Sequence, residues 1–520
     1  EMSYNPDYAL ALPAIMDTRL GPSALPNAGW YTNAMIQNAS DLPANIKITA
    51  TWKQGAGGAN PDAAVTFSLQ PHESIVFRID NPGIAGTIGI PEIANKNFEG
   101  SLMLESDQRV AVVTAVANIP LAPMGVSGGA AKGFYVGQSL RSNGWETGQA
   151  LIYPTFKSGF NGKSSTLFVQ NTTNNSGMVT IEVRTNAGNK YIGQISLDSR
   201  RSAAIHPSDL RRDTDGSPMP SGCSGPANTT GGACFGSVTV QTNSANLRVA
   251  AVATEHVATS TGPLTQILAN TFHKDGNFAS EHKHRYCAPF KNLFQSEGTR
   301  TGIAIMNLSP TNADIAVTLK GLVNPANPAS GNTYSYVFRN VPGRTSVVAS
   351  PYAGNEYTIG GFPVGGLGAV SVDSTHPILA VVSDEDSSLR QTGFQCSSFP
   401  KDKLLAPQVK FAYPSATSSG AANTEIYVQN MGTQSAMITA TYTCRIANSS
   451  VFTTYVTTKS AEAGGAALFS RGNVAVPDGR LCSVSFTSPN PIMIGTATET
   501  TRGLAIPQVD DATYELFSFD

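Results

Sequence analysis

Hydrophobic and polar positions alternate along most of this chain with a period of two residues. In the segment ITATYT, Ile438, Ala440 and Tyr442 fall on one face and the threonines between them on the other. Segments of this kind are rich in Val, Ile, Thr, Phe and Tyr and are separated by Gly, Pro, Asn and Ser, as in strands with one buried face. We find no long, capped run of apolar residues at helical spacing. The pattern predicts an all-β protein.

One segment of the chain recurs four times. Each copy ends a first strand in an asparagine and continues into a Thr-rich second strand. The copies read AMIQNASDLPANIKITATW, LFVQNTTNNSGMVTIEVRT, IAIMNLSPTNADIAVTLKG and IYVQNMGTQSAMITATYTC, and their asparagines are Asn38, Asn171, Asn307 and Asn430. The asparagines lie about 125 to 135 residues apart, the size of a small domain and not of a solenoid turn. We therefore interpret the chain as four diverged copies of one domain.

Two further landmarks accompany each asparagine in the same order. Upstream lies an apolar strand interrupted by a proline, and the four prolines are Pro13, Pro154, Pro289 and Pro407. Downstream, a small-residue entry leads into a strand and then a second apolar strand, as in LCSVSFTSPNPIMIGTATE of the last copy. Six to eight short strands in each copy, separated by turn residues, are typical of an antiparallel β-sandwich. The prolines fit edge positions of its sheets, where the missing N–H is not needed.

The repeat predicts four tandem antiparallel β-sandwich (immunoglobulin-like) domains arranged as a rod. The predicted ranges are 1–12 for an N-terminal extension strand, and 13–148, 149–285, 286–403 and 404–520 for the four repeats. The connections between repeats are long and Gly-rich. We expect each of them to hold a further strand and to pack across neighbouring domains, which makes the rod semi-rigid.

Composition narrows the range of functions. Only 13% of the residues are charged, against roughly 25% in an ordinary soluble protein, and the net charge is −2. A surface of Ser, Thr, Asn, Gln and Gly is poor at keeping molecules apart, so it favours a protein that packs against copies of itself or carries sugar. Basic patches are absent, so we expect no nucleic-acid partner. No apolar stretch reaches about 20 residues, so we expect no membrane span.

The six cysteines partition by repeat. Although six cysteines permit fifteen pairings, three disulfides within repeats are the natural interpretation. The expected pairs are Cys223–Cys234, Cys287–Cys396 and Cys444–Cys482. Disulfides indicate an extracellular or cell-surface protein. No signal peptide heads the sequence, as expected of a secreted protein whose signal has already been removed.

The repeat alignment singles out one of these pairs. Cys444 lies fourteen residues after its asparagine, as Trp52 does in the first copy. Cys482 replaces the glycine that stands at Gly100 and at the equivalent positions of the other copies. We therefore expect a tryptophan over a glycine in the first copy and a disulfide in the fourth to fill one shared site.

Six Asn-X-Ser/Thr sequons could accept glycans in a suitable host. They begin at Asn38, Asn171, Asn174, Asn228, Asn307 and Asn448. In a chain this rich in Asn, Ser and Thr, several such motifs are expected by chance, so the sequence leaves glycosylation open.

The sequence contains no recognisable set of catalytic residues, and we expect the protein not to be an enzyme. The segment GVSGG fits the spacing of a nucleophile elbow, but it lies in a Pro/Gly linker without the strand and helix that the motif requires. No CxxC spacing is present, which disfavours a zinc site built from cysteine.

Two weak metal candidates remain. His282 and His284 occupy alternate positions of a segment predicted to be extended, which would project both imidazoles to one face and could hold a divalent metal. Nothing nearby supplies a third or fourth ligand, so a solvated linker is the favoured interpretation. Asp213 and Asp215 resemble part of a calcium loop without its remaining oxygens. We expect no cofactor, and surface calcium is left open.

The three tryptophans are confined to the first copy and its exit. Trp30, Trp52 and Trp145 could form an exposed platform on which sugar rings stack. Burial in the core is the commoner outcome for an aromatic side chain, because it removes about 150–250 Å² from water, and we favour it here.

The segment GWYTNAMIQNASDLPANIKITATW resembles the GWxTxIxVQN unit of secreted bacterial surface proteins with tandem immunoglobulin-like β-sandwich repeats. The match spans all four copies in pattern, although Met306 stands where Gln is usual and only the first copy retains Gly29 and Trp30. The resemblance implies a cell-surface location and a β-sandwich repeat. It implies no activity, since that family has no catalytic residues to carry over.

Two classes of function are consistent with these features, and a third is less favoured. The leading hypothesis is a non-enzymatic structural subunit of an extracellular homopolymer, such as a filament, sheath or surface layer. The alternative is a cell-surface adhesin or glycan-binding rod, for which exposure of Trp30 or Trp145 beside polar residues is the discriminating feature. A secreted hydrolase would need a buried pair of carboxylates in a cleft between domains.

The repeated asparagine has a structural interpretation. At the end of a strand, its short amide can hydrogen-bond the backbone of the turn that follows. We therefore expect the residue to hold a turn and not a ligand.

Both ends of the chain contain apolar segments that can form strands. The candidate assembly residues are Tyr8, Leu10 and Leu12 near one end and Tyr514, Leu516, Phe517 and Phe519 near the other. Added to the open sheet edge of another subunit, such a strand would gain a ladder of backbone hydrogen bonds. We expect at least one of them, and residues 2–12 in particular, to join subunits in a head-to-tail chain.

Overall fold

The structure is a computed structural model. The described residues are 7–18, 30–55, 62–79, 87–94, 96–118, 131–136, 138–140, 147–148, 150–225, 227, 230–257, 267–271, 273–274, 280–293, 299–324, 326–351, 359, 361–385, 391–398, 401–413, 421–446, 451–490, 492–501 and 512–518. They form two compact units, one in Asn5–Asn277 and the other in Phe278–Asp520. Each unit contains two of the four sequence repeats.

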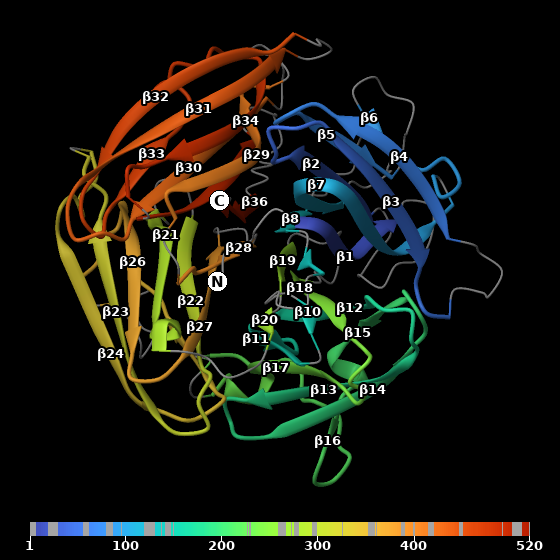
Figure 1. The fold of residues 1–520 in the computed structure, drawn as a ribbon. Coiled ribbons are helices and arrows are strands. Elements are labelled where there is room, and N and C mark those ends of the chain that lie inside the picture. The colour runs from blue at the N-terminus through green and yellow to red at the C-terminus, as the bar shows by residue number, and fades with distance from the viewer. Residues whose placement is uncertain are drawn as a thin grey trace, which may run out of the picture. The chain divides into compact units, whose positions relative to one another are not determined.

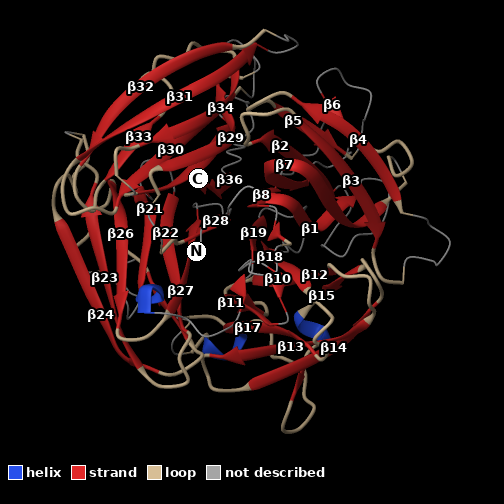
Figure 2. Ribbon diagram, viewed as in Figure 1, coloured by secondary structure: helices blue, strands red, loops and turns tan. Residues whose placement is uncertain are grey.

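The fold is all-β (Figures 1 and 2). The helical elements within the described ranges are the short 3₁₀ turns η1 (Pro207–Asp209), η2 (Gly232–Cys234) and η3 (Ser280–Lys283). None of the helices described is long and apolar enough to cross a membrane.

The first repeat forms one nine-stranded sheet. Its strands are β1 (Asp7–Asp17), β2 (Trp30–Asn38), β3 (Ala44–Trp52), β4 (Ala63–Leu69), β5 (Ser74–Arg78), β6 (Thr87–Ile88), β7 (Phe98–Asn118), β8 (Ala131–Val136) and β9 (Gln138–Ser139). The long strand β7 pairs with β1 and β3 through its first half and with β2 and β8 through its second half, so it serves both layers of strands. The pairs are antiparallel except that of β5 with β6.

The second repeat, in the same unit, forms two sheets. Its strands are β10 (Thr147–Gly148), β11 (Ala150–Lys157), β12 (Lys163–Asn171), β13 (Gly177–Thr185), β14 (Lys190–Leu197), β15 (Ser202–Ile205), β16 (Arg211–Arg212), β17 (Phe235–Thr242), β18 (Val249–Val257), β19 (Ile267–Thr271) and β20 (His273–Lys274). One sheet has the order β16-β14-β13-β17-β11-β20 and the other β10-β18-β12-β15, with β19 paired to β18.

The third repeat belongs to the other unit and forms an eight-stranded sheet. Its strands are β21 (His284–Leu293), β22 (Thr299–Asn307), β23 (Ala313–Gly321), β24 (Thr333–Val341), β25 (Ser346–Ala349), β26 (Gly366–Ser374), β27 (Ile378–Glu385) and β28 (Gln391–Gln395). The order is β24-β23-β26-β21-β22-β27-β28, with β25 paired to β22.

The fourth repeat again forms two sheets. Its strands are β29 (Lys403–Phe411), β30 (Ala422–Asn430), β31 (Ala436–Ile446), β32 (Thr453–Ala461), β33 (Ala466–Phe469), β34 (Arg480–Thr487), β35 (Met493–Thr501), β36 (Ala512–Glu515) and β37 (Phe517–Ser518). The orders are β32-β31-β34-β29-β37 and β33-β30-β35-β36.

The four repeats share one pairing scheme. The strand that ends in the repeated asparagine always pairs with the last long apolar strand of its repeat, as β12 pairs with β18 and β30 with β35. The proline-containing strand always pairs with the strand that follows the small-residue entry, as β11 pairs with β17 and β29 with β34. The expected strand is present in each of the three connections between repeats, because β8, β19 and β28 pair with the last long strand of the preceding repeat. Strand β36 pairs in the same way with the last long strand of the fourth repeat.

The strand prolines lie at β-bulges, so the prediction of edge positions is wrong. The proline-containing strand shifts register at the same place in each repeat, and the shifts fall between Leu12 and Ile15, Tyr153 and Phe156, Cys287 and Phe290, and Ala406 and Val409. A bulge interrupts the ladder and leaves a residue unpaired, so a proline there costs no hydrogen bond.

Residues 7–12 are part of the first repeat and do not form a separate extension. They belong to β1, and Leu10 and Leu12 pair with Leu104 and Leu102 of β7. Both leucines are 1% exposed and join the core of the repeat. The alternation of apolar residues that suggested an external strand therefore serves the chain's own sheet.

The core of each repeat lies between its layers of strands. In the third repeat the cluster combines Ile315 and Val317 of β23 with Ile303 and Ile305 of β22. These strands stand in different parts of the sheet order, so the cluster closes the repeat as a sandwich. In the first repeat the corresponding cluster also takes in side chains of the second repeat, which fuses the two repeats into one unit.

Candidate functional site: recurring polar positions and the contacts between repeats

The repeated asparagine holds the turn that follows its strand. Nδ2 of Asn430 donates to the carbonyls of Gln434 at 2.7 Å and Ala461 at 2.9 Å, and its Oδ1 accepts the N–H of Gly432 at 2.8 Å. Asn38 makes the same pattern with Leu42, Gln70 and Ser40. Asn171 and Asn307 repeat it in the other two copies. All four side chains are used within their own repeats.

Burial removes three of the candidate glycan acceptors. Asn38, Asn171 and Asn307 are 0% exposed, and their amide groups are bonded to the turn. In the folded chain these three side chains are therefore not accessible as glycan acceptors. Asn174 is exposed and accepts a hydrogen bond from Nε of Arg200 at 2.9 Å, so it is an accessible sequon. The sequons at residues 228 and 448 lie outside the described residues.

A second recurring position lies six residues before each asparagine. It carries Thr32, Ser165, Thr301 or Thr424. Each hydroxyl oxygen accepts the backbone N–H of a residue after the bulge, at 3.1, 2.9, 2.8 and 2.9 Å, and the donors are Met16, Lys157, Lys291 and Lys410. The hydroxyl therefore ties the proline-containing strand to the asparagine strand. We did not predict this position from the sequence, although its constant distance from the asparagine distinguishes it.

Three of the repeats carry an ion pair in the core. Lys157 pairs with Glu255 at 2.5 Å, Lys291 with Asp384 at 3.2 Å, and Lys410 with Glu499 at 2.8 Å; the three carboxylate side chains are at most 3% exposed. In each case the lysine lies on the proline-containing strand and the acid on the last long strand. The pair therefore clamps two strands of the sandwich across its interior.

The first repeat replaces this ion pair by apolar side chains. Met16 stands at the lysine position, because its N–H makes the recurring bond to Thr32. Val116 stands at the acid position, six residues after the partner of Asn38, as Glu255 stands six after the partner of Asn171. Met16 and Val116 are 0% exposed. The same site is thus filled either by a paired charge or by two hydrophobic groups.

A neighbouring polar side chain also binds the carboxylate of each ion pair. Thr155 donates to Oε1 of Glu255 at 3.0 Å, Thr301 donates to Oδ1 of Asp384 at 2.5 Å, and Gln408 donates to Oε2 of Glu499 at 3.2 Å. The arrangement is suited to holding strands together.

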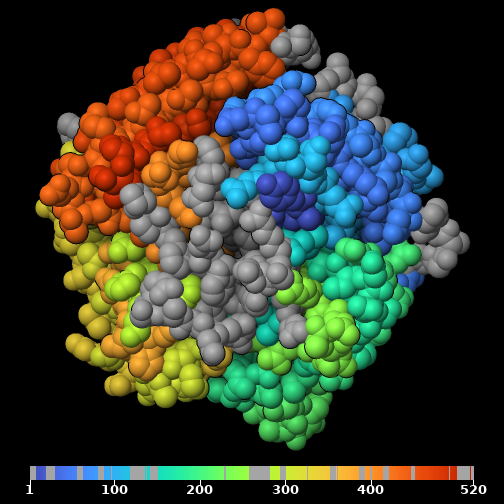
Figure 3. All heavy atoms as spheres, viewed as in Figure 1, coloured from blue at the N-terminus to red at the C-terminus, as the bar shows by residue number. Residues whose placement is uncertain are grey.

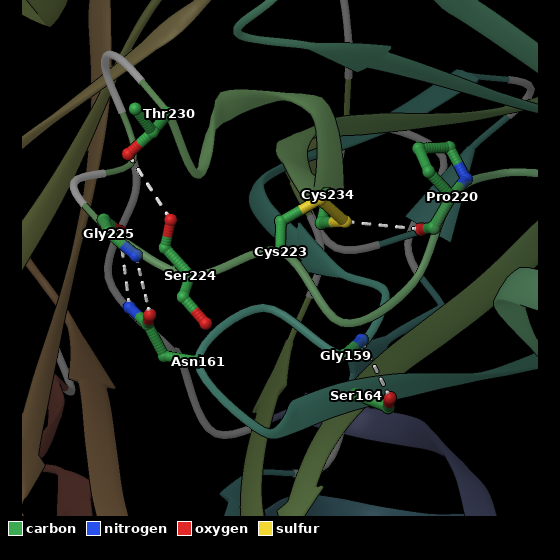
Figure 4. The surroundings of a disulfide bond; sticks show 9 residues. All are labelled: Gly159, Asn161, Ser164, Pro220, Cys223, Ser224, Gly225, Thr230 and Cys234. Carbon is green, nitrogen blue, oxygen red and sulfur yellow. Dashed lines mark hydrogen bonds between the residues drawn. A yellow bond between two sulfur atoms is a disulfide. The ribbon is translucent and has the colours of Figure 1, made fainter.

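Three disulfides join the cysteines in the pairs expected from their partition among the repeats. They are Cys223–Cys234, Cys287–Cys396 and Cys444–Cys482. Figure 4 shows the first of them beside the turn that contains Asn161. The backbone N–H of Asn161 donates to Cys223, and its side chain exchanges two hydrogen bonds with the backbone of Gly225, at 3.0 and 3.3 Å. The disulfide and the asparagine together fasten a long loop to the body of the second repeat.

The prediction of one site shared by a tryptophan and a disulfide is confirmed. Trp52 pairs in register with Gly100, and Cys444 pairs in register with Cys482. The ring of Trp52 packs edge-on against Phe98, with 4.8 Å between ring centroids. A Cβ on Gly100 would lie only 2.1 Å from the carbonyl oxygen of Thr51, so this position admits no side chain beside the tryptophan.

The two weak metal candidates are not brought together as metal sites. His282 lies in η3 and is 1% exposed, whereas the exposed His284 begins β21 and bonds to Asp373 at 2.5 Å. The prediction of two imidazoles on one face of an extended segment is wrong, because the segment turns through a 3₁₀ helix. No group of three or more His, Cys, Asp or Glu side chains suited to a metal occurs among the described residues.

The aspartates of the second candidate are engaged in a hairpin. Asp215 accepts hydrogen bonds from the N–H and Oγ of Ser217, and these bonds lower the pKa of its carboxyl. Asp213 lies 3.8 Å from the ammonium of Lys190. Asp213 and Asp215 therefore act as turn and ion-pair residues here.

The apolar terminal segments pair within their own chain. The prediction that they join subunits is therefore wrong for the described residues: β1 pairs with β7, β36 with β35 and β37 with β29. Tyr514 and Leu516 are buried, and Tyr8 is 45% exposed. Phe517 lies in β37, while residue 519 and residues 2–6 fall outside the described part of the chain. The backbone ladder that was expected from a neighbour is supplied by the chain itself.

Trp30 is 0% exposed and Trp52 is 9% exposed, so both tryptophans belong to the core of the first repeat. The expectation of core tryptophans is met at these two positions. Trp145 lies outside the described residues. The stacking platform considered for sugar rings therefore has no basis at Trp30 or Trp52.

The glutamine before the asparagine joins consecutive repeats within a unit. Nε2 of Gln170 donates to the carbonyl of Leu102 in the first repeat at 3.4 Å, and Nε2 of Gln429 donates to the carbonyl of Val370 in the third repeat at 3.2 Å. Leu102 and Val370 each lie two residues after the entry glycine of their repeat. The two contacts are therefore equivalent, and both glutamines are 0% exposed.

Apolar packing surrounds the two glutamine contacts. Phe168 and Val252 of the second repeat join the core cluster of the first. Tyr427 of the fourth repeat packs against Ala288 and Ala369 of the third. The same element pairs thus pack consecutive repeats in each unit.

The fourth repeat adds polar contacts to its contact with the third. Lys320 donates to the carbonyl of Ala463 at 2.7 Å and lies 3.4 Å from Glu462. A cavity of about 20 Å³ is lined by residues of both the third and the fourth repeat, among them Tyr286, Phe394 and Met493. That volume holds about one water molecule, so the cavity is too small for an organic ligand.

No protein-family model and no curated protein matches this chain. Among solved structures, Thermotoga maritima 1070 aligns with 26% of this chain and 94% of its own, at 16% identity and a TM-score of 0.18. A tetra-tandem repeat from the extending region of a large adhesion protein aligns with 92% of this chain and 93% of its own, at 11% identity and a TM-score of 0.11. TM-scores this low carry no argument about fold or function.

Proposed function

We propose that this chain is a non-enzymatic structural subunit of an extracellular polymer, such as a filament, sheath or surface layer, built from four immunoglobulin-like modules. The observation that carries the proposal is the equivalent contact made by Gln170 and Gln429, each of which binds the preceding repeat through the same backbone position. Modules that stack by a repeated rule are suited to building an extended material.

The use of polar groups supports the same proposal. The recurring asparagines, hydroxyls and ion pairs are all engaged inside their own repeats, where they connect strands. Their positions recur because the architecture recurs. A ligand site would instead distinguish one repeat from the others.

The cysteines support an extracellular location. All six are joined in disulfides, and none is free. Disulfides form and persist in oxidising surroundings outside the cytosol. A secreted structural protein meets this condition.

Electron microscopy of the native extracellular material tests the proposal. Filaments or sheets that antibodies against this chain decorate along their length are the expected result. Single particles of one chain attached to the cell surface would contradict the polymer and favour the alternative, an adhesin or glycan-binding rod. The burial of Trp30 counts against that alternative, because it removes one of the two aromatic rings considered for sugar stacking.

A further inference from the structure

The fourth repeat carries a long open strand at the edge of its sheet. Strand β32 is the first in the order β32-β31-β34-β29-β37, next to β31 (Figure 1). Its nine residues pair with β31 without a register shift, from Thr453 opposite Cys444 to Ala461 opposite Ala436. Its outer side has no partner strand among the residues described. Such a strand presents unpaired N–H and C=O groups and is a template for pairing with another chain.

The equivalent strands of the second and third repeats carry features that block such pairing. In the second repeat β16, with Arg211 and Arg212, pairs with β14 and covers part of its edge. In the third repeat β24 carries the exposed Arg339 and shifts register against β23. Charge, a covering strand and a bulge are all devices that protect an edge.

The equivalent strand of the first repeat is a weaker candidate than β32. Strand β4 has seven residues, and the exposed Lys47 of the neighbouring strand lies opposite its Thr66. On β31 the residues opposite Val456 and Thr458 are instead the uncharged Thr441 and Thr439.

Exposed apolar side chains gather at β32. Five of the ten large exposed hydrophobic residues described in the chain lie between positions 437 and 456, and they are Met437, Ile446, Val451, Phe452 and Val456. Val456, at the middle of β32, is 55% exposed. Val451, Phe452 and Val456 thus leave apolar side chains exposed on β32 and directly before it, and exposed apolar groups that lie together favour an interaction surface.

Lys459, the charged residue of β32, does not project from the exposed face of the strand. Nζ of Lys459 donates to the carbonyl of Leu468 at 2.6 Å and lies 5.3 Å from the centre of the Phe469 ring. Both contacts are with β33, in the facing sheet of the same repeat. The outward positions Thr454, Val456 and Thr458 are uncharged.

We propose that β32 pairs antiparallel with β32 of a second copy of this chain about a twofold axis. The register that pairs all nine residues places Thr457 on the axis and Val456 opposite Thr458 of the partner subunit. Strand β32 is compatible with itself in this register, because its charged residue, Lys459, does not lie opposite its own copy and the outward positions carry no charge. The contact is isologous, so each copy offers the same surface.

The pairing of β32 would be one of the contacts between subunits of the proposed polymer, and its biological role therefore rests on the proposed function. A twofold contact joins subunits in pairs, and a polymer of such pairs needs a second contact elsewhere on the chain. The pairing itself is measured on the purified full chain. Its outcome is therefore separate from that of microscopy on the native material.

Sedimentation velocity of the wild type and two double variants tests the pairing. The wild type is expected to sediment as a dimer. In the double variant Val456→Lys with Thr458→Lys, the lysine at 456 of each copy lies opposite the lysine at 458 of the other copy. Like charges then meet at two places in the contact, and a monomer is expected. Val456→Lys with Thr458→Glu brings opposite charges together in the same register and is expected to restore the dimer. Val337→Lys, at an exposed valine of β24, is the matched control and should leave the dimer intact.

Both changed positions are exposed, so the variants are expected to fold like the wild type. Thermal unfolding checks this. A monomeric wild type at its highest attainable concentration would overturn the inference. It would also be overturned if the two double variants behaved alike, or if Val337→Lys abolished the dimer. A chain that dimerises as expected but forms no polymer in the native material would keep this inference and refute the proposed function.

Discussion

The amide of Asn430 shows how one side chain organises a turn at the residue scale. It bonds three backbone groups, at Gly432, Gln434 and Ala461, and is itself fully buried. Without the amide, the carbonyl of Ala461 would be left without this partner in a buried position. Buried unsatisfied groups cost more than the net worth of the bonds that they lose.

Asn430→Ala is expected to lower the free energy of unfolding by about 2 kcal/mol. Urea denaturation monitored by circular dichroism measures the change. Gln434→Ala removes an exposed side chain but keeps the carbonyl that Asn430 binds, so it serves as the control and should be near neutral. Equal effects of the two substitutions would contradict the role of the asparagine.

His256 makes the stability of the second repeat depend on pH. Burial, aided by the neighbouring His206, lowers the pKa of this imidazole to about 4, against the opposing influence of Glu255. The unfolded chain therefore binds the proton more readily than the folded chain between about pH 6.5 and pH 4. The contribution is complete above pH 6.5 and is lost as the pH falls through 4, a loss of the order of 3 kcal/mol.

Unfolding titrations at pH 7 and pH 4 measure this effect, and His256→Gln is expected to remove it. His284→Gln changes an exposed histidine and should leave the difference between the two pH values as in the wild type. The assignment fails if His256→Gln loses as much stability on acidification as the wild type does.

At the scale of elements, the buried ion pairs and the bulges decide how the two layers of strands are joined. Two kinds of residue pair occupy the equivalent buried site in the four repeats. Three repeats have a lysine with an acid, and the first has Met16 with Val116. A buried ion pair often contributes little more than a hydrophobic pair of similar volume, but removing one partner leaves an uncompensated charge.

Lys410→Met is expected to lower the stability of the fourth repeat by about 3–5 kcal/mol, because it leaves Glu499 buried without its cation. Adding Glu499→Val reproduces the pair of the first repeat and is expected to recover most of the loss. Chemical denaturation of the two single variants and the double variant gives the coupling energy. Additive losses in the double variant would show that the two positions are not equivalent to Met16 and Val116.

The disulfide Cys444–Cys482 joins paired positions of β31 and β34 and closes a loop with a sequence separation of 38 residues. In the chain-entropy description, removing it lowers stability by about 4 kcal/mol. Cys444→Ala with Cys482→Ala, followed by thermal and urea unfolding, measures the loss. A change below about 1 kcal/mol would show that β31 and β34 hold their register without the bond.

The sequence predicts an element well where the role of a residue is set by its immediate neighbours in the chain. The alternation of ITATYT predicts a strand, and the constant place of the asparagine predicts its role in the turn. The alignment of Trp52 with Cys444 predicts their shared site, because both have to lie beside the entry glycine or its replacement. These inferences depend only on local geometry and on the repeat.

Other expectations failed because the sequence does not show what a residue packs against. The alternation around Leu10 indicates a buried face, but it cannot distinguish a strand of the same sheet from one of another subunit. Pro154 is equally compatible with an edge and with a bulge, since neither requires its N–H. The sequon at Asn171 is a local motif, whereas its burial depends on a turn whose contacts come from distant residues.

At the scale of the whole molecule, the contacts between repeats and the open sheet edge are the features that bear on assembly. Gln170 and Gln429 make equivalent contacts in the two units, while β32 offers an open edge in the fourth repeat. The low charge of the chain removes much of the repulsion that keeps ordinary proteins apart. Together these features favour assembly of the chain with itself.

The mass of the native extracellular species, measured by size-exclusion chromatography with multi-angle light scattering, tests this central claim most directly. Large assemblies in which this chain is the main component, many times heavier than its 54.4 kDa, are the expected result. A species with the mass of one chain across the accessible range of concentration would contradict it.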